Sequence, residues 1–538
     1  MSRMFASKVK RLASVAARFD EQGNEVKLRT LKELSGLELK ASRALVGYVE
    51  VLLIVMAMPP DRKVRNIARS ELVRIARVLS IAGQEDREKL INTGLPYTWS
   101  VSRFSHDMTA WLCGERSWQL RVDRFEDAKY DLNEVLAATL PSMERSETTS
   151  GLGNLDLLRA LALDDKDEVR FLVRELKELE DRPRVKDLLF DGLGLYIRMR
   201  SRSRADSRAF NAIRVPRPFL HDRILKEFDA PELMDMPLPD PTRLTQRRKA
   251  EIIRVVKLAM VLTDRETDPV TYMDERTIRY YELERGVSVV IHGMRPSRQL
   301  PMESYIGYTL FKNGYPAAYG GAWVFGARAD FGINIFETFR GGESGYLMCQ
   351  LLRVYAQVFK VTRFEIEPYQ FGLDNPDGIT TGAFWFYHKF GFLPTDPALL
   401  ELSELEVERR LKRPGYRTSA AVLKRFTGGN MALALEEGRP TGVYDITDQV
   451  KRMIRTRYKG DRGRAVTESV RNFLARSGSG PLVDGATAQV LEEVALWAEA
   501  MRVTSPEKLA LMMDMIEVKP VDPYRYQELL LQFFKGEA

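Results

Sequence analysis

The sequence predicts an α+β protein in which a mixed-sheet domain lies between two large all-α regions. Residues 1–200 and 396–538 repeat apolar residues at intervals of three and four, which is typical of helices. Residues 275–395 are rich in aromatic and β-branched residues broken by glycines, which favours strands. Residues 201–274 are expected to form a linker and helical connector. With 538 residues and 44% hydrophobic content, the chain can form two or more domains.

The N-terminal region is expected to be one helix after another. The stretch "SELVRIARVLSIAG" places apolar residues on one helical face and arginines on the other. The most apolar stretch, "VEVLLIVMAMPP", is interrupted by Glu50 and ends at Pro59 and Pro60. A membrane span needs about 20 apolar residues, so we expect a buried helix and no membrane span.

An arginine-rich stretch follows, "YIRMRSRSRADSRAFNAIRVPRP", with seven arginines in Arg198–Arg217. Such a stretch could hold RNA, a carrier protein or an acidic lipid surface, and it could equally be a solvated connector. Further on, "TQRRKAEIIRVVKLAMVLTD" has the pattern of an amphipathic helix.

The sheet domain is predicted from the order of its segments. Asn313 and Gly314 separate two apolar runs, which is a strong hairpin signal. The strand "ADFGINIFETF" follows, then the helix "SGYLMCQLLRVYAQVFKV", the strand "TRFEIEPYQFG" and the short helix "TGAFWFYHKFG". This order predicts a mixed sheet. Helices are expected again after Pro394, with a flexible break at "RSGSGPLVDG".

Cysteine and histidine usage narrows the function classes. Cys113 and Cys349 are the two cysteines, far apart and without metal-ligand spacing, and the four histidines lack ligand partners at suitable spacing. No metal site is therefore expected, and the compartment is expected to be reducing and cytoplasmic. The N-terminus lacks the apolar core of a secretory signal. A net charge of +7 on so long a chain favours anionic ligands only weakly.

The segment "NIFETFRGGESGYLMCQLLRVY" carries the first candidate site. A strand runs into an Arg-Gly-Gly-Glu-Ser-Gly turn, and the turn opens a helix. Glycines allow a ligand to approach the backbone, and the free amides and dipole of a helix N-terminus attract anions. Arg340 adds a fixed positive charge suited to phosphate.

Together with the downstream pattern, this turn resembles the GNAT superfamily of N-acyltransferases over roughly residues 275–395. Arg340 and Gly345 match the ends of that family's turn motif, Gln/Arg-x-x-Gly-x-Gly/Ala. A second motif, Asn-x-x-Ala-x-x-x-Tyr-x-x-x-Gly-Phe, is matched by Ala383, Tyr387, Gly391 and Phe392.

The resemblance implies transfer of an acyl group from acyl-CoA or acetyl-CoA to an amine, on a small molecule or a protein. The thioester would lie in the splay between two parallel strands, where a backbone donor near the end of "NIFETF" would polarise its carbonyl. The amides of Ser344, Gly345 and Tyr346 would hold the pyrophosphate. The whole implied CoA-binding set is Arg340, Gly341, Gly342, Ser344, Gly345 and Tyr346.

The same resemblance implies the catalytic groups. Tyr387 would act as general acid toward the leaving thiolate. Glu337, on the strand before the turn, is the first candidate for the base that deprotonates the amine, followed by Glu367 and Glu365. Tyr387 could also be a core tyrosine, and Cys349 is expected to be a buried packing residue rather than a nucleophile.

Two departures from the family pattern keep alternatives open. Glu343 stands where the turn motif has a glycine, and its carboxylate would either repel a pyrophosphate or cap the helix. Thr380 stands at the asparagine position, after a long loop "GLDNPDGITT". The donor could therefore be aminoacyl-tRNA or an acyl carrier protein, or the domain could be a non-catalytic module in a helical scaffold for partner binding.

Overall fold

A computed structural model describes residues 2–478 and 485–535, which belong to two compact units. Unit 1 takes in the chain up to Ile224 together with Leu244–Tyr272 and Phe311–Pro316. Unit 2 takes in Leu225–Arg243, Met273–Leu310 and the chain from Ala317 onward. The core of the break expected at "RSGSGPLVDG" lies outside the described residues.

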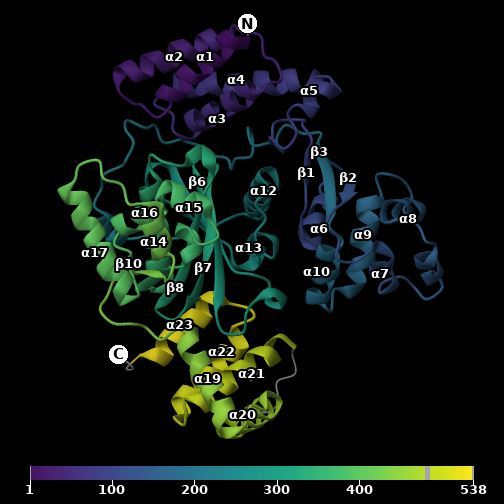
Figure 1. Ribbon diagram of the computed structural model, residues 1–538, viewed down its shortest axis with the longest axis vertical. Helices are drawn as coiled ribbons and strands as arrows, with labels where there is room; N and C mark the ends of the chain where they lie inside the picture. Colours follow the sequence, from purple (N-terminus) through teal and green to yellow (C-terminus); the bar gives the residue numbers. More distant parts are fainter. Residues whose placement is uncertain (1, 479–484, 536–538) are drawn as a thin grey trace. The chain divides into compact units, whose positions relative to one another are not determined.

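Unit 1 is mainly helical and begins with four helices that pack on one another (Figure 1). The helices before the connector are α1 (Ser2–Val15), α2 (Glu21–Ser35), α3 (Arg43–Ala57), α4 (Arg62–Ile81), α5 (Gln84–Glu88), α6 (His106–Gly114), α7 (Leu132–Ala137), α8 (Asn154–Leu161), α9 (Glu168–Leu176) and α10 (Pro183–Gly192). The stretch "VEVLLIVMAMPP" ends the buried helix α3, as expected. Its Tyr48 hydroxyl donates to the buried Glu71 carboxylate at 2.9 Å.

The expectation of an all-α N-terminal region is wrong, because this unit contains a three-stranded sheet. Its strands are β1 (Ser100–Ser102), β2 (Trp118–Phe125) and β3 (Leu195–Ser201), in the order β1-β3-β2 with antiparallel pairing. The signal was present in β3, where buried and half-buried residues alternate. Its apolar positions stand between arginines, so the strand period of two was hidden in an arginine-rich stretch.

Part of the predicted connector also folds with unit 1. The amphipathic helix is confirmed as α12 (Gln246–Thr263), followed by α13 (Asp268–Thr271). Asn211 Nδ2 donates to the Val255 carbonyl of α12 at 2.9 Å, and Arg254 of α12 pairs with Asp206 at 2.5 Å.

Unit 2 is built on an eight-stranded sheet in the order β10-β11-β9-β8-β7-β6-β5-β4. Its strands are β4 (Arg279–Glu282), β5 (Val287–His292), β6 (Ser304–Lys312), β7 (Tyr315–Phe325), β8 (Arg328–Ile335), β9 (Arg363–Ile366), β10 (Leu393–Pro394) and β11 (Met431–Ala434). The expected hairpin is confirmed between β6 and β7, where Asn313 and Gly314 take φ values of 46° and 88°. Two positive values are what a type I′ turn requires.

The sheet is mixed, as predicted, because β8 and β9 run parallel while the β4–β5, β7–β8, β9–β11 and β10–β11 pairs are antiparallel. The crossover from β8 to β9 is α14 (Ser344–Phe359), and α16 (Ala383–Lys389) follows β9. One continuous hydrophobic core joins α14 and α16 to the sheet. The segment expected as a long loop, "GLDNPDGITT", contains the helix α15 (Pro376–Thr381). The expected strand "TRFEIEPYQFG" is shorter than predicted, because β9 ends at Ile366 and a short 3-10 helix, η7 (Pro368–Phe371), follows it.

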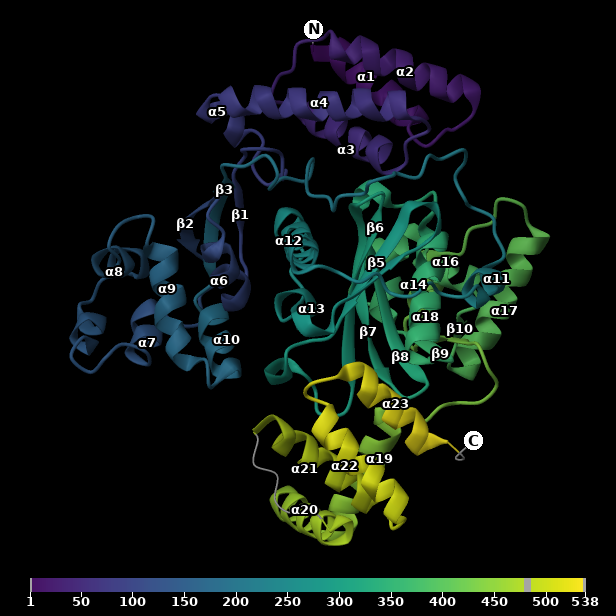
Figure 2. The same ribbon diagram turned by 180° about the vertical axis from the view of Figure 1, so that it is seen from behind.

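The C-terminal region is helical except for the strand β11, so the prediction that this region is all-α is wrong at this strand. β11 pairs with both β9 and β10, so this region completes the sheet. The helices that surround it and follow it are α17 (Pro397–Lys412), α18 (Ala420–Phe426), α19 (Val443–Arg457), α20 (Arg462–Ser477), α21 (Gly485–Ala500), α22 (Pro506–Val518) and α23 (Pro523–Phe534). Figures 1 and 2 show α19–α23 gathered at one end of the sheet.

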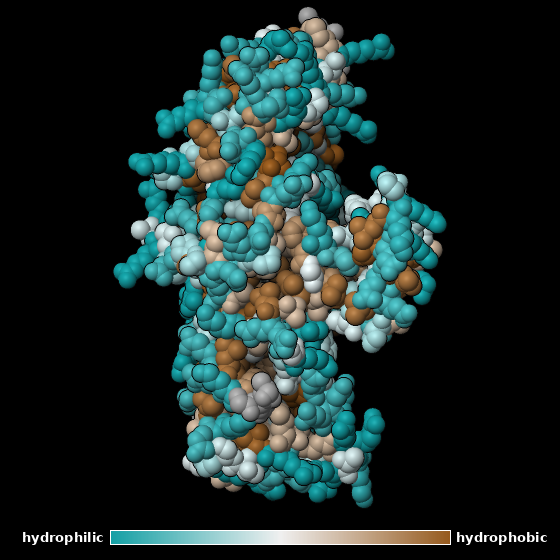
Figure 3. Space-filling view, turned by 90° about the vertical axis from the view of Figure 1, so that its left-hand side faces the viewer, coloured by the Kyte–Doolittle hydropathy of each residue, from teal (hydrophilic) through white to brown (hydrophobic). Residues whose placement is uncertain are grey.

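The surface is largely hydrophilic on the face drawn in Figure 3, with apolar side chains in smaller areas between polar ones. Among the described residues, no helix combines the length and the apolar character that crossing a membrane requires.

Candidate functional site

The candidate site lies where the crossover begins, at the end of β8. The parallel register joins Arg328, Ala329 and Asp330 of β8 to residues of β9, and the last pair is Asp330 with Glu365. β8 continues to Ile335, beyond this last pair, and stays paired with β7 on its other side. The two parallel strands are therefore paired only through the first three residues of β8. The second half of β8 presents a backbone edge on the β9 side.

The turn after β8 has the geometry expected from its glycines. Gly341 and Gly342 take φ values of 79° and 56°, and a Cβ added at Gly341 would meet nothing within 4 Å. Arg340 is exposed, and its Nε donates to the Ile335 carbonyl at 3.2 Å. This contact holds the guanidinium beside the turn, where it can meet an anion.

Of the first backbone amides of α14, that of Ser344 already has a hydrogen-bond partner in the turn. The Ser344 amide is engaged, because it donates to the Gly341 carbonyl at 3.2 Å. The Gly345 amide comes next at the start of a 16-residue helix, where the backbone amides and the dipole carry partial positive charge. The Tyr346 side chain is buried, and its hydroxyl accepts from Gln350 at 2.8 Å.

Glu343 neither caps the helix nor faces the turn as an unpaired carboxylate that would repel a pyrophosphate. It is buried at 5% exposure and makes no side-chain cap to α14. Its Oε1 instead accepts from the Leu225 amide at 3.1 Å and pairs with Arg285 at 3.0 Å. Because a guanidinium neutralises this inward-facing carboxylate, its repulsion of an anion at the turn is weak.

Gly345 is required by a close approach to α16. A Cβ on this residue would lie 2.1 Å from the ring of Phe390. That ring stacks on Phe228 with 5.9 Å between centroids and meets Phe386 edge-on at 5.5 Å. The two motifs found in the sequence are therefore in direct contact, with the turn of the first packed against the aromatic helix of the second.

Tyr387 is buried at 3% exposure, and its hydroxyl donates to Gln370 Oε1 at 3.2 Å. Gln370 belongs to η7, and its amide lies against β8, since a Cβ on Gly332 would come within 3.2 Å of it. Tyr387, Gln370 and Gly332 thus meet beside the second half of β8. Burial raises the pKa of the Tyr387 phenol above its usual range, so the hydroxyl keeps its proton.

The three carboxylates considered as a base are not equivalent. Glu337 lies in a short 3-10 helix, η6 (Glu337–Phe339), and not on the strand as expected; it is exposed. Glu367 is also exposed, at the start of η7. Glu365 is buried and pairs with Arg328 at 3.0 Å and Arg363 at 2.8 Å, so it is committed to structure.

A group of titratable residues near the start of β8 was missed in the sequence. Burial, and then the Asp330 charge, raises the pKa of the Glu303 carboxyl to about 7. Burial lowers the pKa of the Lys519 ammonium to about 7, and Lys519 Nζ donates to Gln299 Oε1 at 2.9 Å. No local pattern reveals this group, because 216 residues separate its two members along the chain.

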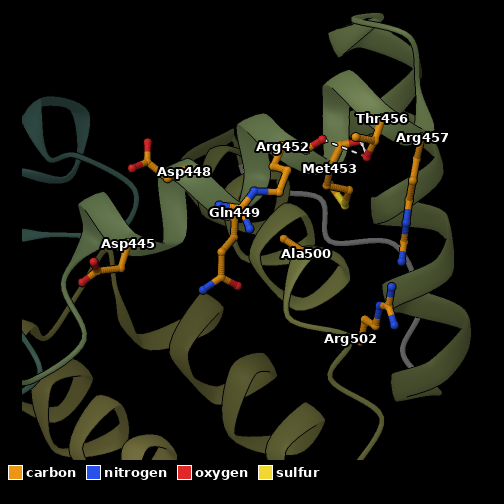
Figure 4. A pocket seen from close by; sticks show the side chains of 9 residues that line it. All are labelled: Asp445, Asp448, Gln449, Arg452, Met453, Thr456, Arg457, Ala500 and Arg502. Carbon is orange, nitrogen blue, oxygen red and sulfur yellow. Dashed lines mark hydrogen bonds between the residues drawn. The ribbon is translucent and has the colours of Figure 1, made fainter.

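Among its described residues, unit 2 contains two open cavities, and the larger one is lined in part by Phe390 and Gly391 of the second motif. One of about 940 Å³ is bordered by α11 (Ala230–Asp235), the end of α14 and β11. The other, of about 490 Å³, lies in the C-terminal helices, where the Arg457 and Arg502 guanidinium groups point toward each other (Figure 4). It is lined by Asp445, Asp448, Gln449, Arg452, Met453, Thr456, Arg457, Ala500 and Arg502. Two aspartates and three arginines are among these residues, and Arg457 pairs with Glu499 at 2.9 Å.

The fold and the site define an α+β protein with a parallel crossover, a glycine turn at the N-terminus of α14 and a buried tyrosine beside the part of β8 that extends past its pairing with β9. Among the described residues, no three His, Cys, Asp or Glu side chains cluster as metal ligands would. No family model, curated protein sequence or solved structure matches the chain.

Proposed function

We propose that this chain is a GNAT-like N-acyltransferase that moves an acyl group from acyl-CoA or acetyl-CoA to an amine. One observation carries the proposal: β8, its glycine turn, α14 and β9 form a parallel crossover whose free strand edge lies beside Tyr387. The order of strands, with the parallel β8–β9 pair between the antiparallel β7–β8 and β9–β11 pairs, supports the same assignment.

Binding of the donor is assigned to the turn. Arg340 and the amide of Gly345 would hold the pyrophosphate, and the open space at Gly341 leaves room for the approach. The pairing of Glu343 with Arg285 supports a phosphate-bearing donor, because it weakens the repulsion that the sequence had suggested. Bound acyl-CoA would supply the activated carbonyl carbon.

Transfer forms a C–N bond and breaks a C–S bond, so one proton leaves the amine and one reaches the sulfur. Tyr387 keeps its phenol proton and can donate it to the leaving sulfur once Gln370 turns aside. Exposed Glu337 follows β8 and exposed Glu367 follows β9, and either carboxylate can take the amine proton through water. Backbone amides of the β8 edge can polarise the carbonyl.

Titration calorimetry against acetyl-CoA and longer acyl-CoAs tests the proposal. We expect saturable binding that Arg340→Ala weakens, and acyl transfer to a panel of amines that Tyr387→Phe slows by about 10²–10⁴-fold, the usual contribution of a positioned acid. Tyr444→Phe is the control, since this tyrosine is 60% exposed on α19. Failure of every acyl-CoA to bind the folded protein would rule out the CoA-dependent function.

A second candidate is a non-catalytic module in a helical scaffold, and the hydrogen bond between Tyr387 and Gln370 favours it. In this state the tyrosine is a satisfied core residue. This candidate expects unchanged behaviour in Tyr387→Phe apart from a loss of stability of about 1 kcal/mol. Donors such as aminoacyl-tRNA or an acyl carrier protein are tested in the same assay by replacing the CoA thioester.

A further inference from the structure

The three-stranded sheet of unit 1 has two chemically different faces. Alternate residues of β3 and of the first half of β2 are buried, and β2 contacts α6, α8 and α9. The other residues point away from these helices, and the register places Gln119 opposite Arg200 and Arg121 opposite Arg198. Cross-strand neighbours of like charge destabilise a sheet unless something compensates them.

An aromatic ring lies within this basic face. Trp99, just before β1, is half-buried, and the guanidinium groups of Arg198 and Arg200 lie 5.0 and 4.6 Å from its ring centre. Both distances are within the range of cation–π attraction. The Trp99 ring therefore packs against the guanidinium groups of two arginines at the sheet surface.

Three arginines of this face are left without a carboxylate. Arg198 pairs with Glu88, and Arg121 pairs with Asp165 at 3.0 Å. Arg87, Arg200 and Arg202 form no ion pair among the described residues; Arg200 contacts Gln119 at 2.7 Å instead.

The field at Arg200 reflects this excess of positive charge. Burial, followed by the charges of Arg87, Arg202 and Arg121, lowers the pKa of its guanidinium. Repulsion among cations held this close is relieved when an anion lies between them.

We propose that this basic face, made of Arg87, Trp99, Arg121, Arg198, Arg200 and Arg202, binds single-stranded nucleic acid. Unpaired arginines supply the contacts to phosphates, and the Trp99 ring and the arginine planes supply surfaces on which unpaired bases stack. An acidic lipid surface or an acidic peptide would use the charge but would leave the ring without a role. Of the arginine-rich stretch Arg198–Arg217, the proposed site uses the arginines on and just after β3. Residues far away in the sequence, from α5 to β2, complete it.

The test is fluorescence anisotropy of the full-length protein with a labelled 12-nucleotide single-stranded uridine RNA, at several salt concentrations. The double variant Arg200→Gln with Arg202→Gln removes two cations. Neither forms an ion pair among the described residues, so no carboxylate loses its partner. We expect at least a tenfold weaker Kd and a salt slope smaller by about 1.4, from roughly 0.7 per phosphate contact on a single strand. Trp99→Ala should weaken binding at least fivefold, through lost stacking.

The matched control is Arg62→Gln with Lys63→Gln, which removes two exposed cations from α4 in the same unit. Its Kd and salt slope should stay close to those of the unaltered protein. Ultraviolet cross-linking of the unaltered protein avoids any folding defect, and the cross-linked peptides should include Trp99 or the β3 arginines. The proposal is overturned if RNA does not bind, if the control weakens binding equally, if Trp99→Ala has no effect, or if only vesicles of anionic lipid bind.

Discussion

Gly345, the second residue of α14, lies directly against the ring of Phe390, and this contact gives the first residue-scale prediction. Gly345→Ala should lower stability by about 1–3 kcal/mol, because the ring is held by Phe228 and Phe386 and cannot yield freely. Urea unfolding measures the effect. Gly463→Ala in α20 is the control, since its Cβ would find only an ordinary contact at 3.7 Å and should leave stability equal or slightly higher. Equal midpoints for the two variants would contradict the packing described here.

Lys519 makes stability depend on pH. Burial lowers its pKa to about 7 in the folded state, against about 10.4 in the unfolded chain. Between these values the unfolded state binds more protons, so stability rises with pH by up to about 1.4 kcal/mol per unit from this group. Lys519→Met should remove that rise between pH 7.5 and 10, whereas Lys451→Met, at a side chain 61% exposed, should retain it. The measurement is the urea midpoint of each protein across this pH range. Parallel pH profiles for the unaltered protein, Lys519→Met and Lys451→Met would refute the prediction.

At the scale of elements, the packing of the C-terminal helices depends on the buried ring of Trp497. Trp497 of α21 is fully buried and packs on Phe533 with 4.8 Å between centroids and on Phe325, the last residue of β7, at 5.9 Å. Trp497→Ala should cost about 3–5 kcal/mol. Hydrogen exchange followed by mass spectrometry should show the loss in α19–α23 and not in α1–α4.

Leu411→Ala is the matched variant for this element, since Leu411 is 78% exposed on α17. Its exchange pattern should equal that of the unaltered protein. An increase in exchange spread evenly over the whole chain in Trp497→Ala would mean that the C-terminal helices are not a separate cooperative element.

At the scale of the whole molecule, unit 1 is assembled from segments that the chain does not supply in succession. Its helix α12 comes after the stretch 225–243, which belongs to unit 2. A fragment of residues 1–224 should therefore fail to fold cooperatively, because it lacks the partners of Asn211 and Asp206. A fragment of residues 1–274 should show a cooperative thermal transition by circular dichroism. Identical melting of the two fragments would contradict this assignment of α12.

Local patterns in the sequence determined much of the helical content and the order of the sheet. The turn of Asn313 and Gly314 was predictable because few residues tolerate two positive φ values in succession. Helices α12 and α14 were predictable because their apolar residues follow a helical period. Helix α3 was predictable because its apolar run is too short to span a membrane and stops at two prolines. The sequence also brought out Gly345 and Tyr387 as members of two motifs, without showing that the motifs touch.

Only the tertiary structure decided what depends on distant partners. It turned Glu343 inward to Arg285, placed Tyr387 on Gln370 and lowered the pKa of Lys519 by burial. It also converted part of an arginine-rich stretch into β3, because strands form by pairing with segments far away in sequence. The physical reason is common to these cases: periodicity and turn chemistry are local, whereas burial, charge pairing and strand pairing depend on which segments the fold brings together.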